Sequence, residues 1–418
     1  MNPFLIVIVS ALIVNFILNL TAESLNLKSI KPKLPPEVKD FYDENQYRRS
    51  QEYLVVNTRL GFLSDTFELI LIFGFWFASG FNTLDQIVRS WEFNSIISGL
   101  LYIAILLLGR GFVMLGFRIY STFVIEERFG FNKTDRATFA LDLAKGLFIS
   151  LAFGAPILGL IFWFLESAGN WAPLFCWSSF TIYLLTVQYI APMWIMTLFH
   201  KFTPIEDGPL KDTLLTYAQS VNFPLTQIYV IDGSRRSSKA NAFFTGFGKN
   251  KRVALFDTLV EQQSIPEIES VLAHEIGHYK NKHIFKNLIF SLIHMGILFY
   301  CLSIFLTNRE LFNAFFIDNI SVYVGLVLFG VLFSPIEAIL SIIIQMISRR
   351  YEREADRFAF ETTSNPECLV NALKKLSVNN LTNLTPHPFY VFINHSHPPV
   401  LERIHAIRSS TNYGSLAK

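Results

Sequence analysis

The chain has 418 residues, of which 51% are hydrophobic and only 16% are charged, against about 25% charged in ordinary soluble domains. This composition, with 42 Phe, is typical of a membrane protein with one sizeable soluble part and excludes a wholly soluble fold. The net charge of +2 gives no support for a nucleic-acid partner. The three cysteines, Cys176, Cys301 and Cys368, form neither a disulfide framework nor a C-x-x-C metal clamp.

Seven apolar segments are long enough to cross a bilayer, which takes about 20 residues of helix. The first lacks the basic start and the cleavage site of a signal peptide, so we expect it to remain as a transmembrane helix. The seven segments are residues 3–21, 62–82, 97–117, 146–166, 172–199, 285–307 and 320–347. Polar residues in or beside them either pair to fix helix packing or line a polar chamber; they are Asp65, Glu68, Arg110, His294 and Glu337.

The basic residues between these segments predict the orientation. The 22–61 loop carries seven Lys/Arg and the 118–145 loop carries five, whereas the loops on the other side contain only Arg89 and Arg309. The positive-inside rule therefore places the N-terminus outside and the 200–284 segment and the tail after 348 in the cytoplasm.

Residues 200–284 have the pattern of a mixed α/β unit. A helix is predicted over 208–220, followed by strands at 225–232, 242–247 and 252–256, the last two joined across 248–250. Ser264, Pro266 and Glu267 then form a helix start, with Ser as the N-cap and Glu three residues later as its capping-box partner.

This helix carries His274-Glu275-Ile276-Gly277-His278, an H-E-x-x-H motif. Histidines four apart lie on one helical face, so both imidazoles can reach one Zn²⁺ while Glu275 acts as a general base on an activated water. Short motifs also recur by chance, and two structural histidines would give the same letters. A nearby third ligand would favour the metal site.

The segment after the last span supplies candidates for that ligand. Glu352 and Asp356 are four apart on one helical face, so Glu352 could complete a zinc triad and Asp356 could hydrogen-bond a ligand histidine. Glu354 is also a candidate by residue type but lies on a different face from Asp356. By composition alone, this run could equally be a solvated charged face.

Taken together, these motifs resemble the type I CaaX prenyl proteases, which are integral-membrane zinc metalloproteases of the gluzincin group. The resemblance rests on the seven spans, the H-E-x-x-H helix before span six and the E-x-x-x-D helix after span seven. It extends to the segments 120–132 (YSTFVIEERFGFN), 241–243 (NAF) and 396–403 (SHPPVLER), and so covers nearly the whole chain.

The resemblance implies one Zn²⁺ per chain, held by His274, His278 and Glu352, with Glu275 as the catalytic base and acid and Asp356 behind the ligands. It further implies two groups outside these helices. Asn241 and Ala242 would lie on an edge strand that pairs with the extended substrate, and His397 and Arg403 would stabilise the oxyanion. His387 and His395 could be confused with His397, which we favour because it matches the family pattern.

The predicted fold is mainly α: a barrel of seven transmembrane helices around a large chamber, closed by a cytoplasmic α/β protease domain. We expect spans 1–5 in residues 1–199, the first part of the protease domain in 200–284, spans 6–7 in 285–347 and its second part in 348–418. The expected chain is a monomer in the lipid bilayer that cleaves peptide or prenylated-protein substrates near a C-terminal CaaX motif.

Three alternatives remain open from the sequence. One is a quality-control zinc protease with unlipidated membrane-protein substrates, and another is a heat-shock-type membrane protease of the wider superfamily, which has fewer spans. The third is a non-catalytic seven-span receptor, transporter or scaffold, against which the intact Glu275 argues. The compact chain without a retrieval signal favours a bacterial inner membrane, with the endoplasmic reticulum membrane as the eukaryotic alternative.

Overall fold

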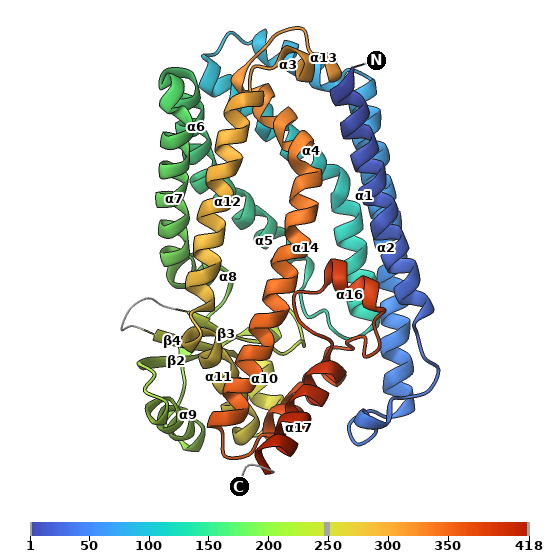
Figure 1. Cartoon of the computed structure of the whole chain (residues 1–418), viewed down its shortest axis with the longest axis vertical. Coiled ribbons are helices and arrows are strands. Elements are labelled where there is room, and N and C mark those ends of the chain that lie inside the picture. Colours follow the sequence, from blue (N-terminus) through green and yellow to red (C-terminus); the bar gives the residue numbers. More distant parts are fainter. Residues whose placement is uncertain (1, 246–250, 416–418) are drawn as a thin grey trace.

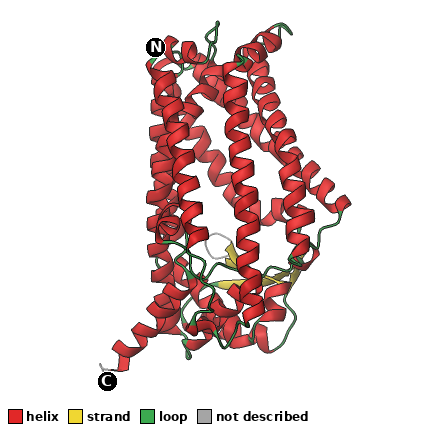
Figure 2. Ribbon diagram, turned by 90° about the vertical axis from the view of Figure 1, so that its right-hand side faces the viewer, coloured by secondary structure: helices red, strands yellow, loops and turns green. Residues whose placement is uncertain are grey.

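The computed structural model describes residues 2–245 and 251–415. Long helices run along one axis of the molecule, and a small sheet with shorter helices closes one end of them (Figure 1). The N-terminus lies at the end away from the sheet and the C-terminus at the sheet end (Figures 1 and 2). The strands are confined to that end, so the fold is mainly helical, as predicted.

Within the described residues, six helices are long and apolar enough to cross a membrane. Two of them contain π-helical turns, η2 (Ser121–Glu126) and η3 (Ser150–Gly154), at which the helix continues without interruption. The six are α1 (Pro3–Lys28), α2 (Glu44–Phe77), α4 (Ser95–Tyr120) with η2, α5 (Arg136–Ile149) with η3 and α6 (Ala155–Ser167), α12 (His283–Phe305), and α14 (Val322–Thr362).

The remaining predicted span, residues 172–199, is helical but is not one of these six. It forms α7 (Ala172–Ile190), the π-helical η5 (Ala191–Ile195) and α8 (Met196–Phe199). Residues 172–199 contain no Asp, Glu, Lys or Arg. α7 packs against both α6 and α12 (Figure 1).

Several helices extend well beyond the predicted spans. The region predicted as the 22–61 loop is mostly helical, because α1 continues to Lys28 and α2 already begins at Glu44, where Asp43 and Gln46 form a capping box. Apolar runs mark only the part of a helix that faces hydrocarbon, so polar extensions escape a hydropathy reading. The longest case is α14, whose 41 residues run without a break from the membrane region to the sheet end.

Short helices close the end of the molecule opposite the sheet. There α3 (Gly80–Arg89) and α13 (Arg309–Ala314) lie near the start of α1 (Figure 1). The Trp76 indole donates a hydrogen bond of 2.9 Å to the carbonyl of Ala314 and stacks on Phe315. These buried contacts join α2 to the connection between α12 and α14.

Four of the five polar residues noted within the spans pair with a polar residue of another helix. Arg110 of α4 lies 2.5 Å from Glu68 of α2, and His294 of α12 lies 2.9 Å from Glu337 of α14. Each pair joins two different helices, as expected for residues that fix helix packing.

The sheet has four strands in the order β1-β2-β4-β3. Its strands β1 (Phe202–Pro204) and β2 (Leu225–Ile231) are antiparallel, β2 and β4 (Lys251–Phe256) are parallel, and β3 (Ala242–Thr245) pairs antiparallel with β4. The three predicted strands are confirmed where residues are described; positions 246–250 lie outside that range. The short strand β1 was not predicted, because three residues are too few for a pattern.

Helices cover the sheet and complete a hydrophobic core. The sheet contacts α9 (Pro209–Ser220), α10 (Asp257–Gln262) and α11 (Ile265–Lys280). The chain ends with α15 (Glu367–Asn379), which packs on α11, followed by α16 (Pro388–Asn394) and α17 (Val400–Ser415). The core joins segments before and after the last two long helices, with Leu214, Leu255, Leu272, Val370 and Ile404 all nearly or fully buried. The sheet end of the molecule thus has one hydrophobic core built from two separated stretches of chain.

Candidate active site

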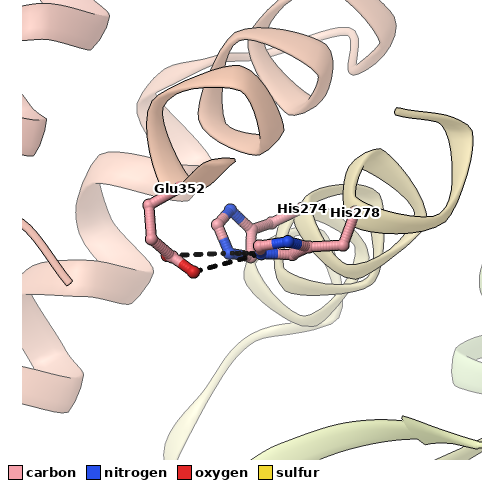
Figure 3. A group of neighbouring side chains, drawn as sticks. All are labelled: His274, His278 and Glu352. Carbon is pink, nitrogen blue, oxygen red and sulfur yellow. Dashed lines mark hydrogen bonds and ion pairs between the residues drawn. The ribbon is translucent and has the colours of Figure 1, made fainter. Parts of the chain in front are cut away.

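The H-E-x-x-H motif lies on α11, whose start has the predicted capping box between Ser264 and Glu267. Its two histidines project from one face of the helix toward α14 (Figure 3). Their Nε2 atoms are 3.2 Å apart, and His274 is 8% exposed. The spacing of four residues therefore places the two imidazole nitrogens close together, as the motif predicts.

Glu352 faces these histidines from α14 (Figure 3). Its two carboxylate oxygens lie 3.4 Å from Nε2 of His274 and 3.2 Å from Nε2 of His278. One ligand atom from each of the three residues lies within 4.8 Å of the others. Glu352 is 4% exposed, and its Oε2 is a buried atom without a hydrogen-bond partner among the described residues.

This donor set fits zinc. Two imidazoles and one carboxylate are the ligands of one type of catalytic zinc site, which leaves a fourth position open for water. Nitrogen-rich ligation favours zinc over the harder magnesium and calcium ions. The buried and unsatisfied oxygen of Glu352 adds to this fit, because a buried carboxylate without a partner is costly unless a cation compensates it.

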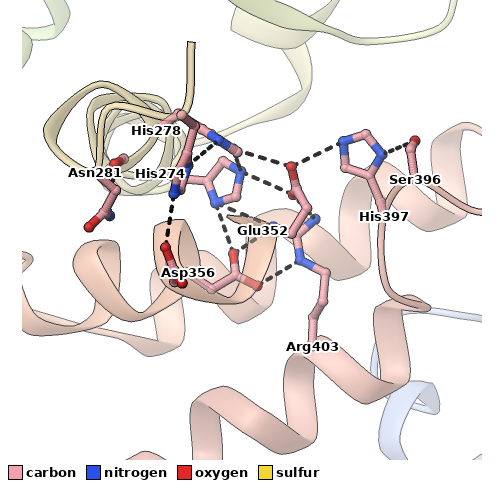
Figure 4. A network of polar contacts seen from close by, with 11 residues as sticks. His274, His278, Asn281, Glu352, Asp356, Ser396, His397 and Arg403 are labelled. Atoms are coloured by element: carbon pink, nitrogen blue, oxygen red, sulfur yellow. Dashed lines mark hydrogen bonds and ion pairs between the residues drawn. The ribbon is translucent and has the colours of Figure 1, made fainter. Parts of the chain in front are cut away.

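Asp356 and Arg403 lie directly behind these three residues (Figure 4). Oδ1 of Asp356 is 2.9 Å from Nδ1 of His274, and Arg403 of α17 donates two hydrogen bonds, of 2.8 and 2.6 Å, to the same carboxylate. Burial alone would lower the pKa of His274, but Asp356 and Glu352 outweigh it and raise that pKa to about 9. A carboxylate thus fixes the orientation of the first histidine, as is usual for metal ligands.

His397 approaches from the chain segment before α17 (Figure 4). Its Nε2 is 3.3 Å from Oε1 of Glu352, and its Nδ1 is 2.9 Å from the Ser396 hydroxyl, while the side chain remains 63% exposed. His387 instead caps α16 by accepting a hydrogen bond from the Phe389 N–H, and the carbonyl of His395 accepts one from Arg349. Of the three candidate histidines, only His397 reaches the cluster.

A pocket of about 350 Å³ opens onto this cluster. Its lining includes eight of the nine predicted site residues, namely Asn241, Ala242, His274, Glu275, His278, Glu352, His397 and Arg403; the ninth, Asp356, lies behind them. Ala242 begins β3, which lies at the end of the strand order, so a strand edge borders the pocket.

One wall of the pocket escaped the sequence reasoning. Leu369, Leu373 and Leu376 of α15 line it together with Val271 of α11. The leucine spacing of four and three is that of one helical face, but such a stripe predicts only burial and not which pocket it faces. Asn380, just after α15, also lines the pocket, and its amide contacts the backbone of Ala240.

Close packing of two helices makes this arrangement possible. A Cβ added at Gly277 would lie 3.0 Å from both Cα and O of Ala355. The backbones of α11 and α14 therefore meet at the motif glycine, which is one residue before His278. Glu352 lies on α14 three residues before Ala355, so it faces the histidines beside this contact.

The helices of transmembrane length and the His₂Glu cluster define the class as a multi-pass membrane metallopeptidase. Residues 24–201 match the family described as CAAX prenyl protease N-terminal, five membrane helices, and residues 204–411 match peptidase family M48. The chain belongs to the CAAX prenyl protease 1 family of M48 metallopeptidases.

Relatives and a solved structure agree over almost the full length. The chain is 34% identical to CAAX prenyl protease 1 homolog of Arabidopsis thaliana, covering 97% of each chain. It is 34% identical to CAAX prenyl protease 1 of Saccharomyces cerevisiae, over 91% of this chain and 89% of the relative. The crystal structure of S. mikatae Ste24p superposes with a TM-score of 0.93 at 31% identity, covering 97% of this chain and 99% of that one.

Proposed function

We propose that the chain is a zinc endopeptidase that hydrolyses peptide bonds near the C-terminus of prenylated CaaX proteins. The observation that carries this proposal is the 350 Å³ pocket in which the His₂Glu cluster borders the edge of β3. The relatives named above are CAAX prenyl proteases, which supports the same substrate class.

His274, His278 and Glu352 are the proposed zinc ligands, and Asp356 holds His274 in its ligating orientation. When bound, the zinc lowers the pKa of a water toward about 7 and polarises the scissile carbonyl. The protein's own groups then govern where the proton and the developing charge go.

Glu275 is the proposed general base. It lies in the pocket lining between the two ligand histidines, from where its carboxylate can accept the proton of the attacking water and then pass it to the leaving amine. His397 is the proposed donor to the oxyanion, since its exposed ring reaches Glu352 from the pocket side. Arg403 would assist through Nη1, the terminal nitrogen that does not bond Asp356.

Asn241 and Ala242 are the proposed docking edge for the substrate backbone. β3 pairs with β4 along one side, so an extended peptide can add to the other side as a further strand. The apolar wall formed by α15 would contact the aliphatic side chains of the peptide.

We further propose that 172–199 is a seventh span and that the spans enclose a chamber. The strongest support is the pair Glu68–Arg110, which lies in the apolar region with side chains 38% and 59% exposed. Charges exposed to hydrocarbon are costly, so such a pair is better placed against a water-filled interior. The seven lysines and arginines in residues 22–61 and the five in 118–145, against only Arg89 and Arg309 in the loops on the other side, support a cytoplasmic active site.

Localisation and assembly also remain proposals. The relatives from Arabidopsis thaliana, Saccharomyces cerevisiae and Homo sapiens are eukaryotic, which favours the endoplasmic reticulum membrane over the bacterial inner membrane that the sequence suggested. The proposed protein is a monomer. Its proposed membrane spans lie in residues 1–199 and 285–347, and its proposed protease domain consists of residues 200–284 and 348–418.

The test is cleavage of a farnesylated CaaX peptide by the purified protein in detergent, with and without a zinc chelator. Glu275→Ala should retain zinc and lose activity by about 10²–10⁴-fold, the usual contribution of a general base. Glu269→Ala is the matched control, because Glu269 is a partly buried acid on the same helix but does not line the pocket.

The outcomes separate the alternatives. Chelator-sensitive cleavage that is lost in Glu275→Ala and kept in Glu269→Ala supports the proposal. Equal cleavage of the unfarnesylated peptide would move the assignment to unlipidated substrates and thus to quality control. A wild-type protein that binds zinc but cleaves neither peptide would contradict the enzyme assignment.

A further inference from the structure

His278, the second proposed ligand histidine, contacts a side chain outside the H-E-x-x-H motif. Nδ1 of His278 lies 3.0 Å from Nδ1 of His283, and Nε2 of His283 lies 3.0 Å from Oε2 of Glu354. His283 is 2% exposed and its ring stacks on Tyr351 at a centroid distance of 4.0 Å and an angle of 11°. A chain of side chains thus runs from a proposed ligand to a carboxylate on α14.

The turn between α11 and α12 brings these rings together. Asn281 ends α11 and donates a hydrogen bond of 2.9 Å to the carbonyl of Gly277. Lys282 then adopts a left-handed conformation with φ 58°, which reverses the chain within two residues. His283, the first residue of α12, therefore returns beside His278 and does not continue along the axis of α11.

Glu354 is fixed independently of the histidines. Its Oε1 accepts a hydrogen bond of 2.9 Å from Nε of Arg350, one turn earlier on α14. The sequence left Glu354 open as a zinc ligand, but its side chain faces His283, and the metal cluster comprises His274, His278 and Glu352. Glu354 is thus engaged on both oxygens, away from the metal position.

The protons can be assigned consistently along this chain of contacts. His278 presents Nε2 to the metal position, so its neutral ring carries hydrogen on Nδ1 and can donate to Nδ1 of His283. Since that nitrogen accepts, the neutral ring of His283 carries its hydrogen on Nε2 and donates to Glu354. Each ring then uses one donor and one acceptor, and no proton is left over.

We propose that His283 and Glu354 are positioning residues that set the tautomer and ring orientation of His278. The proposal rests on the zinc site proposed above. Asp356 does the same for His274 by direct contact, whereas His278 reaches its carboxylate through a second imidazole. Partners of this kind orient metal ligands and increase their basicity, and their loss weakens metal binding by about 10–100-fold.

The test measures zinc affinity of the full-length protein in detergent by competition with a chromogenic chelator. His283→Leu removes the acceptor while filling the buried site, and it should weaken zinc binding by about 10–100-fold. His283→Asn retains an acceptor oxygen near the position of Nδ1 and should recover most of the affinity. Replacing zinc with cobalt adds a second readout, since the visible spectrum should change in His283→Leu.

His294→Leu is the matched control. His294 is on the same helix and forms the same type of pair with a glutamate of α14, at 2.9 Å, but it contacts none of the proposed ligands. Its loss should leave zinc affinity and the cobalt spectrum unchanged, even if the melting temperature falls.

Two results would overturn the proposal, and they are distinguishable. If wild type binds zinc and His283→Leu binds it equally with an unchanged cobalt spectrum, His283 only holds the helices together. If wild type binds no zinc, the proposed function fails together with the inference that rests on it.

Discussion

The contact between α11 and α14 at Gly277 can be tested with a single methyl group. In Gly277→Ala, the new Cβ would stand 3.0 Å from Cα and O of Ala355 and 3.1 Å from Cβ of Phe358. All three atoms belong to the backbone or its first side-chain carbon, so no side-chain rotation relieves the contact. The two helices must separate by a few tenths of an ångström.

Two opposing effects determine the stability of this variant. Alanine is favoured over glycine inside a helix by about 1 kcal/mol. Overpacking of a tight core position costs about 1–3 kcal/mol. The net change in unfolding free energy should therefore be a loss of about 0–2 kcal/mol, which is small for a folded protein. The effect on the metal site should be larger, because Glu352 is on the helix that is displaced.

We therefore expect Gly277→Ala to fold, to melt slightly below wild type and to bind zinc more weakly. Melting in detergent and chelator competition measure the two effects separately. Gly330→Ala is the control, since Gly330 lies on α14 with nothing within 4 Å of its added Cβ. A Gly277→Ala variant with wild-type zinc affinity and a higher melting temperature would refute the idea that this contact sets the ligand geometry.

Further predictions concern the helix cap, the strand edge and the metal. Burial opposes ionisation of Glu267, but Lys375, 2.6 Å away, and the Ser264 backbone hold its pKa below the ordinary value of 4.5. The ionised carboxylate therefore stabilises the folded protein above pH 4.5, and this contribution is lost as the pH falls through the folded-state pKa. Glu267→Gln should thus lower stability at pH 7 by roughly 0.5–1 kcal/mol, with a difference in melting temperature that shrinks on acidification; a constant difference would contradict the ion pair. Lys239 lies three residues before β3 and forms a 2.9 Å ion pair with Glu126, which Lys239→Met would break. Because β3 is the proposed docking edge for the substrate, this variant should raise KM for peptide cleavage more than it lowers kcat. An unchanged KM would exclude a role of this ion pair in substrate docking. Chelation should lower the melting temperature, because a ligand present at 100 times its Kd adds about 2.7 kcal/mol; an unaffected melting temperature would argue against a site in the folded state.

Local sequence signals were sufficient for the elements that carry the site. The capping box marked the start of α11 correctly, and the spacing of four placed Glu352 and Asp356 on the face that meets the histidines. These features depend on one helix at a time, and helical periodicity fixes them without knowledge of the fold.

Contacts between elements were harder to predict. The sequence could place Glu354 on a different face of α14, but its partner depends on the reversal at Lys282, which brings His283 back toward α11. The position of Leu369 and Leu373 in the pocket likewise depends on how α15 packs on α11. Neither relation is encoded in the periodicity of a single segment.

The continuity of α14 explains why the proposed site suits a lipid-anchored substrate. The apolar part of this helix ends at Ile347, and Glu352 follows five residues later, which is about 7.5 Å along a helix axis. His283 opens α12 at the same level, directly after the helix that carries His274 and His278. The proposed zinc position therefore lies within about two helical turns of the membrane surface. A tail held in the bilayer by its lipid can reach that depth with the adjacent peptide bond, whereas a folded soluble protein would have to unfold a segment to do so.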